Sequence, residues 1–156
     1  MSEQNASFPH VIIGLQELNA NEIKGVNNLL RQLSRSSSAS VIDEDIVAKM
    51  LNQPNFRLII LKNWHSGEVI GMASLYYYKS FNVTGGIGRV EDVVVDQKYR
   101  GRGLGEMIIK FTIRLAKTLT LKELELTSNP KRIEANKLYL KMGFQKYDTN
   151  YYVMDL

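Results

Sequence analysis

The chain of 156 residues contains no cysteine, two histidines and three prolines. The absence of cysteine excludes a disulfide framework, a thiolate metal site and a covalent mechanism through an enzyme thiol. The two histidines, His10 and His65, stand far apart and form no cluster with zinc-like spacing, so we expect no metal ion. No apolar run approaches the roughly 20 residues that a membrane-spanning helix needs, and the first residues lack the layout of a signal peptide. We therefore expect a cytoplasmic protein with no membrane partner.

Composition and charge are those of an ordinary globular protein. Hydrophobic residues make up 44% of the chain and charged residues 23%, and the length predicts a single domain over residues 1–156. The net charge of +4 would suit an anionic ligand, although a solvated surface carries a similar excess. Apart from residues 98–102, basic residues do not gather into a stripe with aromatic side chains, so we expect no nucleic-acid partner.

Hydrophobic periodicity predicts strands and helices that alternate along the chain. Asn19, with Glu22 three residues later, resembles a capping box at a helix start, and Ser66-Gly67 fits a hairpin turn. This order predicts an α/β (α+β) fold, with a mixed central sheet of six to seven strands flanked by about four helices. The predicted strands are 10–14, 56–62, 69–78, 90–95, 121–127, 144–146 and 151–155, and the predicted helices are 19–33, 43–52, 107–118 and 132–142.

The segment 93–106, VVVDQKYRGRGLGE, reads as a buried strand, a basic glycine-rich turn and a helix start. Free N–H groups at a helix N-terminus carry partial positive charge, and glycines let an anion approach the backbone closely. Lys98, Arg100 and Arg102 add positive charge to this turn. The segment therefore predicts a phosphate or pyrophosphate site, and the alternative is a tight turn that needs glycine only for its backbone shape.

The spacing within this turn narrows the choice of phosphate ligand. A Walker A loop is excluded because Gly105 is followed by Glu106 and Met107 instead of lysine and a hydroxyl residue. The dinucleotide-binding fingerprint is nearer, since Gly101, Gly103 and Gly105 miss it by one position. A dinucleotide-binding fold opens with this unit, however, whereas here about 90 residues precede it.

Two motifs resemble those of the GNAT superfamily of acetyl-CoA-dependent N-acetyltransferases. Residues Arg100–Gly105 match its (Arg/Gln)-x-x-Gly-x-(Gly/Ala) motif, and Ala135, Tyr139, Gly143 and Phe144 fit its Ala-x-x-x-Tyr-x-x-x-Gly-Phe pattern. The motifs have the order and spacing of the family, and the resemblance covers about residues 69–156. It implies a single-domain GNAT-like fold with a sheet splayed at the acetyl-CoA site, and a homodimer, as family members often are.

The resemblance also implies where acetyl-CoA, the co-substrate, would bind. Backbone N–H groups of the glycine turn would hold the pyrophosphate, and the pantetheine arm would pair with the strand before it. Many members have asparagine seven residues before the tyrosine, where this chain has Arg132. The implied coenzyme-binding residues are Val93, Val94, Val95, Arg100, Gly101, Arg102, Gly103, Leu104, Gly105, Asn129, Arg132 and Asn136.

Acetyl transfer to an amine needs a neutral amine, a stabilised oxyanion and a proton for the departing thiolate. Tyr139 matches the family tyrosine that faces the sulfur, so the resemblance implies a general acid; the alternative is a tyrosine that only packs on its helix. The resemblance implies an oxyanion donor among the backbone N–H groups near Val93 or Val94.

Glu91 and Asp92 are the candidate bases at the mouth of the same strand. Because neighbouring residues of a strand point to opposite faces, we expect only one of them to reach a given substrate directly. Either carboxylate would relay the ammonium proton through water or bind a cationic substrate, and the alternative is a salt bridge to Arg89.

The sequence thus predicts an N-acetyltransferase that acts on a small primary amine by direct attack in a ternary complex. Residues 126–132 resemble aminoalkylphosphonate N-acetyltransferases and residues 90–95 resemble glucosamine-6-phosphate N-acetyltransferases, whose acceptors carry an anionic group. Arg35, Lys79 and Lys131 are candidates for a basic rim that would bind such a group. The alternatives are a protein or peptide N-acetyltransferase and a non-catalytic acyl-CoA sensor.

Overall fold

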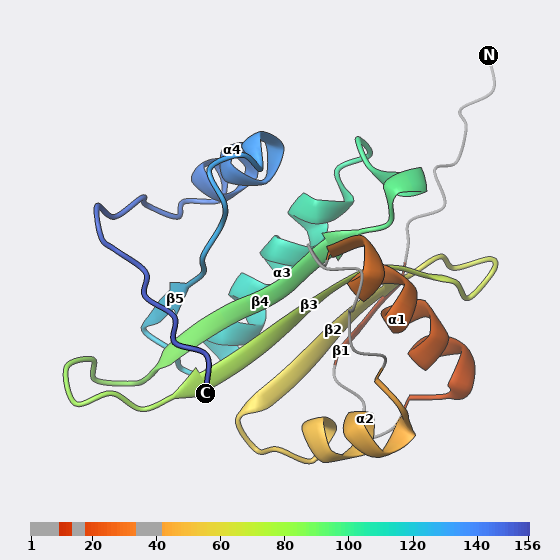
Figure 1. Cartoon of the computed structure of the whole chain (residues 1–156), viewed down its shortest axis with the longest axis horizontal. Helices are drawn as coiled ribbons and strands as arrows, with labels where there is room; N and C mark the ends of the chain where they lie inside the picture. Colours follow the sequence, from red (N-terminus) through yellow and green to blue (C-terminus); the bar gives the residue numbers. More distant parts are fainter. Residues whose placement is uncertain (1–9, 14–17, 34–41) are drawn as a thin grey trace.

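The computed structural model describes residues 10–13, 18–33 and 42–156; Arg35 lies outside these ranges. Five strands of the described chain form one sheet in the order β1-β2-β3-β4-β5 (Figure 1). The first three pairings are antiparallel and the pairing of β4 with β5 is parallel, so the sheet is mixed as predicted. The strands are β1 (His10–Ile13), β2 (Phe56–Lys62), β3 (Val69–Tyr78), β4 (Ile87–Val95) and β5 (Glu123–Glu125).

Helices cover both faces of the sheet (Figure 1). Side chains of α1 pack with Leu58 and Ile60 of β2, whereas α3 packs with Ile59 and Leu61. Strand β2 is therefore buried on both faces, which is why its sequence is a continuous apolar run instead of an alternating one. The described helices are α1 (Ala20–Leu33), α2 (Glu44–Leu51), α3 (Leu104–Thr118) and α4 (Ile133–Lys141), with a short 3-10 turn η1 (Gln97–Tyr99) before α3. None of these described helices is long and apolar enough to cross a membrane.

Local signals in the sequence place several helix ends correctly. The capping box forms as predicted: the backbone N–H of Glu22 donates to Asn19 Oδ1 and that of Asn19 donates to Glu22 Oε2, both at 3.0 Å. Gly143, at a φ of 94°, directly follows the C-cap of α4. The predicted starts of β4 (90) and α3 (107) are three residues late, since these elements begin at Ile87 and Leu104.

The predicted strand count of six to seven is wrong for the described chain, which forms five. Residues 144–146 and 151–155 form no strand, although both were predicted as strands. A strand exists only where a neighbour offers its hydrogen-bonding groups, and β5 is three residues long instead of the predicted 121–127. The apolar residues of the C-terminal segment also bury little area, because Tyr147, Tyr152 and Met154 are exposed.

The sheet opens between β4 and β5, as the resemblance implied. Their ladder runs only from Ile87 opposite Glu123 to Arg89 opposite Glu125. Beyond Arg89, β4 continues to Val95, and in the described chain no strand pairs with it on that side. The segment after β5 instead leaves the sheet toward α4 (Figure 1). One edge of β4 is thus left open just before the glycine-rich turn.

Candidate active site

The glycine-rich turn between β4 and α3 depends on a left-handed backbone. Gly101 and Gly103 have φ values of 75° and 76°, and a Cβ at either would meet no atom within 4 Å. Glycine is required at these two positions for backbone conformation and not for space. Gly105 differs, because a Cβ there would lie 3.2 Å from Leu138 Cδ2 of α4. The third glycine therefore lets α3 and α4 pack closely.

Hydrogen-bond donors accumulate at this turn. The first backbone bond of α3 runs from the N–H of Met107 to the carbonyl of Gly103 at 3.1 Å. Within the described residues, no backbone oxygen accepts a hydrogen bond from the N–H groups of Gly101, Gly103 or Gly105. Such free donors at the start of a 15-residue helix form an anion site. The predicted pyrophosphate site therefore has the donor set that an anion requires.

Two arginines are held at the same turn by its own carbonyl groups. Arg100 Nε donates to the carbonyl of Val95 at 2.9 Å, and an Arg102 guanidinium nitrogen lies 3.4 Å from the carbonyl of Lys98. The Arg102 guanidinium also lies 5.5 Å from the centre of the Tyr99 ring. Both positive charges are exposed and stay beside the free N–H groups. The turn thus combines backbone donors with two positioned cations.

The open edge of β4 carries the predicted residues Val93, Val94 and Val95. Val94 packs in the core beneath α1, while Val93 and Val95 pack toward α3. From the side of α4, a guanidinium nitrogen of Arg132 lies 3.3 Å from the carbonyl of Val93. This contact shows that the edge accepts hydrogen bonds from a group lying between β4 and α4. A ligand with amide groups would find strand-like partners there.

Asn129 and Asn136, also predicted to bind the coenzyme, shape the loop that leads into α4. Asn136 Nδ2 donates to the carbonyl of Asn129 at 3.0 Å, and Asn129 Oδ1 accepts from the backbone N–H of Lys131 at 2.8 Å. These bonds fix the start of α4 and with it the position of Arg132. A coenzyme contact of the two asparagines stays a prediction.

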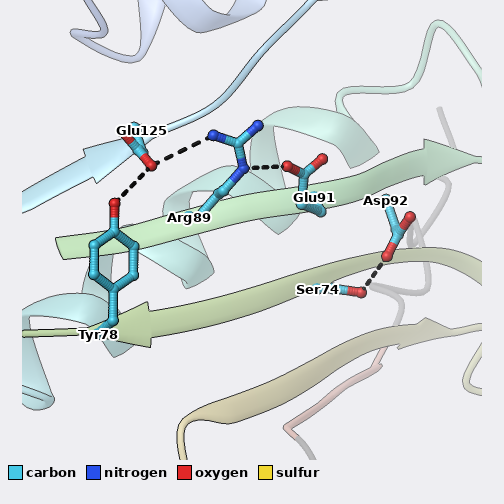
Figure 2. A network of polar contacts seen from close by, with 6 residues as sticks. All are labelled: Ser74, Tyr78, Arg89, Glu91, Asp92 and Glu125. Carbon is cyan, nitrogen blue, oxygen red and sulfur yellow. Dashed lines mark hydrogen bonds and ion pairs between the residues drawn. The ribbon is translucent and has the colours of Figure 1, made fainter. Parts of the chain in front are cut away.

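A β-bulge in β4 sets the direction of Asp92. Glu91 pairs with Ser74 and Val94 with Met72, so Asp92 and Val93 together face the single residue Ala73 of β3. Asp92 has a φ of 53°, one of two non-glycine residues with positive φ in the described chain. Its Oδ2 accepts a hydrogen bond from Ser74 Oγ at 2.7 Å (Figure 2).

The bulge also corrects the expectation that Glu91 and Asp92 point to opposite faces. Cross-strand partners share a face, and the partner of Glu91, Ser74, is also the residue that Asp92 contacts. Both carboxylates therefore lie on the face that α1 and α2 cover farther along the sheet. The strict alternation used for the prediction fails because the bulge inserts one extra residue.

A second polar network joins β3, β4 and β5 on this face (Figure 2). Arg89 Nε lies 2.5 Å from Glu91 Oε1, and an Arg89 guanidinium nitrogen lies 3.4 Å from Glu125 Oε1. The Tyr78 hydroxyl donates to the same Glu125 oxygen at 3.1 Å. Burial alone would lower the pKa of Arg89, but the two carboxylates outweigh it and raise this pKa. The predicted alternative of a salt bridge to Arg89 is thus confirmed for Glu91.

Tyr139 lies on α4, and its ring is packed into the core on the α3 face of the sheet. Its side chain contacts the cluster of Leu75, Val90 and Ile109, and its ring meets Phe144 edge-on with centroids 6.0 Å apart. Burial is the main cause that raises the pKa of Tyr139; the Arg132 charge opposes it. The phenol consequently keeps its proton at neutral pH. The packing role is confirmed, and the acid role stays a prediction.

Comparisons with known proteins agree with this geometry. The model of the Acetyltransferase (GNAT) family matches residues 26–144, which include the bulge, the glycine turn and α4. The chain belongs to the GNAT acetyltransferase family. Acetyltransferases of this family use acetyl-CoA, and the donor-rich turn and open edge fit that co-substrate. N-acetyl transfer from acetyl-CoA is accordingly the activity of this chain.

Several relatives share this family membership. A glucosamine 6-phosphate N-acetyltransferase of Trypanosoma brucei brucei is 27% identical over 139 residues, 88% of this chain and 92% of the relative. An aminoalkylphosphonate N-acetyltransferase of Salmonella typhimurium is 30% identical over 104 residues, 65% of either protein. The crystal structure of a Trypanosoma brucei acetyltransferase superposes with a TM-score of 0.75 at 25% identity, over 95% of this chain and 99% of that one.

One ion-pair cluster of this GNAT chain was missed by sequence reasoning. Glu106, in the first turn of α3, pairs with Lys110 at 2.7 Å and with Lys141 of α4 at 2.6 Å. Hydrogen bonds from these two lysines lower the pKa of Glu106 to about 2. The pair of Glu106 with Lys110 has helical i,i+4 spacing and could have been predicted from the sequence. The pair with Lys141 could not, because the two residues are far apart in the chain. The cluster ties α4, which carries Tyr139, to the glycine-turn end of α3.

The remaining predicted site residues are placed as follows. Lys79 and Lys131 are exposed, and Arg35 lies outside the described residues, so the basic rim stays a prediction. Within the described ranges, no group of three or more histidine, cysteine, aspartate or glutamate residues could hold a metal ion.

Proposed function

We propose that this GNAT enzyme transfers the acetyl group of acetyl-CoA to the primary amine of a small molecule by direct attack in a ternary complex. The observation that carries the proposal is the open edge of β4. It leads from the carboxylates Glu91 and Asp92 directly to the glycine turn, so one strand presents both an acceptor region and a donor site. The relatives named above act, by their names, on small amines.

The chain's own residues would hold the donor in two places. Backbone N–H groups of residues 101–105, with Arg100 and Arg102, bind the diphosphate by charge-assisted hydrogen bonds. Residues 93–95 bind the amide groups of the arm along the free edge of β4, and Arg132 with the loop around Asn129 and Asn136 closes the other side. Acetyl-CoA supplies the activated acyl group.

The reaction requires three proton and charge movements, each assigned to a group of this chain. A carboxylate of Glu91 or Asp92 takes the ammonium proton, directly or through water, and the neutral nitrogen attacks the carbonyl carbon. A backbone N–H near Val93 or Val94 donates to the carbonyl oxygen as negative charge develops there. Tyr139 donates its phenolic proton to the departing thiolate as the C–S bond breaks, and the phenolate regains a proton, through water, from the nitrogen that becomes the amide.

The charge of the sheet face that carries Glu91 and Asp92 supports a positively charged acceptor. Glu91 and Glu125 pair with the Arg89 guanidinium, and Asp92, which contacts the neutral Ser74 hydroxyl, adds a third carboxylate to the same face. This excess attracts an ammonium group at neutral pH. An anionic group elsewhere on the acceptor is supported by the names of the glucosamine 6-phosphate and aminoalkylphosphonate relatives. A spermine/spermidine N(1)-acetyltransferase of Bacillus subtilis, 29% identical over 85 residues, 53% of this chain and 56% of that one, supports a polycation instead.

We further propose a homodimer in the cytoplasm. The dimer is supported by the exposed apolar side chains near the C-terminus, Tyr147, Tyr151, Tyr152, Val153 and Met154. Light scattering tests it, and a monomer at micromolar concentration contradicts it. The cytoplasmic location stays a prediction from the composition.

The decisive experiment measures coenzyme A release from acetyl-CoA against phosphorylated amino sugars, aminoalkylphosphonates, polyamines and N-terminal peptides. We expect turnover with one class of small amine, above the rate of acetyl-CoA hydrolysis without an amine. Preferred turnover of peptides would favour protein acetylation. Silence across the panel, with acetyl-CoA binding shown by calorimetry, would favour the sensor and contradict the proposal.

A further inference from the structure

Ser74 is a polar residue in an otherwise apolar stretch of β3. It is 1% exposed, and its neighbours Ala73 and Leu75 are fully buried. A buried hydroxyl needs a hydrogen-bond partner, and the partner of Ser74 Oγ is Asp92 Oδ2 at 2.7 Å. At this distance the hydroxyl proton is directed at the carboxylate, which leaves Asp92 Oδ1 for another ligand.

The backbone of Asp92 needs support from its surroundings. Its φ of 53° is unfavourable for a side chain with a Cβ and persists only where neighbouring contacts hold it. The contact with Ser74 joins the extra residue of the bulge to the strand opposite it. Figure 2 shows the Asp92 carboxylate turned across to β3, apart from the network of Arg89 and Glu91.

The two candidate bases differ in their partners. Glu91 contacts the Arg89 guanidinium, so this carboxylate already has a cationic partner within the chain. Asp92 contacts a neutral hydroxyl and forms no ion pair with any described residue. Its negative charge is thus left for an incoming cation.

We propose that Ser74 is a positioning residue that holds the Asp92 carboxylate in the orientation in which it binds the acceptor ammonium and takes its proton. The inference rests on the proposed function, and it assigns the base role to Asp92 in preference to Glu91. The proton moves from the acceptor nitrogen to the carboxylate, and Ser74 keeps its own proton throughout.

The test is a double-mutant cycle with Ser74→Ala, Asp92→Asn and the double variant, each assayed with the amine that the panel identifies. We expect Ser74→Ala to lower kcat about tenfold and to leave the KM for acetyl-CoA unchanged, as loss of an orienting partner does. In the Asp92→Asn background the same change should have little further effect on kcat, because its target is already lost. Ser74→Thr keeps the hydroxyl and should restore most of kcat.

A buried hydroxyl on the other face of the sheet provides the control. Thr112 of α3 is 1% exposed, and its Oγ1 donates to the carbonyl of Ile108 at 2.9 Å. Thr112→Val removes a hydroxyl from the core without touching the bulge, so kcat should stay at the wild-type value whatever the change in Tm. Thermal unfolding of all variants separates loss of fold from loss of orientation.

Three outcomes are distinguishable. Wild-type kcat in Ser74→Ala, or a kcat loss that adds fully to that of Asp92→Asn, overturns the positioning role and leaves the proposed function intact. Tm losses that add fully in the double variant show that the two side chains do not interact, which also overturns it. A wild-type enzyme that binds acetyl-CoA and acetylates no amine overturns the proposed function, and the role of Ser74 with it.

Discussion

The donor half and the acceptor half of the proposed active site are built from different chemical groups. The donor half consists mainly of backbone N–H and carbonyl groups of one continuous segment, residues 93–105. The acceptor half consists of side chains from three strands, with Ser74 on β3, Asp92 on β4 and Glu125 on β5. A backbone site depends on local conformation and tolerates most side-chain changes. A side-chain site depends on strand register and is sensitive to single atoms.

A substitution at Asp92 should separate the two halves most strongly. Asp92→Asn keeps the shape of the side chain and removes its charge, so kcat should fall about 300-fold, within the range of a lost general base. The Kd for acetyl-CoA, measured by calorimetry, should stay at the wild-type value because the donor half is untouched. Asp148→Asn, at an exposed position, is the matched control. A raised Kd with unchanged kcat would assign Asp92 to the donor half.

A substitution at Tyr139 tests whether a side chain beside the donor half acts as the general acid. Tyr139→Phe keeps the ring in the core and removes the acidic proton, so kcat should fall about 50-fold with little change in acetyl-CoA affinity. Because burial raises the pKa of Tyr139, the wild-type phenol should keep its proton at least to pH about 10. Tyr147→Phe, at an exposed tyrosine, controls for the loss of a hydroxyl. Unchanged turnover would remove Tyr139 from the acid role.

A substitution at Gly103 tests the donor half through its backbone. Gly103→Ala strains a left-handed residue and turns the N–H groups away from the diphosphate, so acetyl-CoA affinity should fall about tenfold while kcat at saturation stays unchanged. Gly67→Ala is the matched control, since Gly67 also has a positive φ, 70°, and open space around it in the β2–β3 turn. An equal loss of affinity in both variants would point to a general loss of stability instead.

Replacing Glu106 tests the contact between α3 and α4 beside the donor half and should show the smallest effect. Glu106→Gln should lower Tm by about 2 °C at pH 7. The pKa of Glu106 is lowered to about 2, so its ion pairs stabilise the fold above pH about 4.5 and lose this contribution as pH falls toward 2. The Tm difference from the wild type should therefore vanish near pH 2. Glu134→Gln, which breaks a pair within α4 alone, should shift Tm less.

Elements with strong local signals were predicted closely. The bounds of β2 and β3 agree with the predicted 56–62 and 69–78, because apolar runs and the turn at Ser66-Gly67 mark them. The glycine turn was found for the same reason, since a left-handed backbone restricts the residue type. The strands predicted at 144–146 and 151–155 do not form. Alternating apolar residues favour a strand only where a neighbouring strand is available for pairing, and the local sequence does not supply that neighbour.

The bulge at Asp92 carried no such signal. The sequence Val90-Glu91-Asp92-Val93 is equally compatible with a regular strand, and the extra residue follows from the register that β3 imposes on both sides of Ala73. The choice between Glu91 and Asp92, and the role of Ser74, depend on that register.

Local sequence is therefore sufficient for the family, the glycine turn and several helix ends, because backbone conformation and capping involve residues that are near one another in the chain. Which partner each of the two carboxylates Glu91 and Asp92 has is decided by tertiary structure. Ser74 and Asp92 are 18 positions apart, and Arg89 and Glu125 are 36 apart. Contacts across such distances arise only when strand pairing has set the register, so their chemistry follows from the fold.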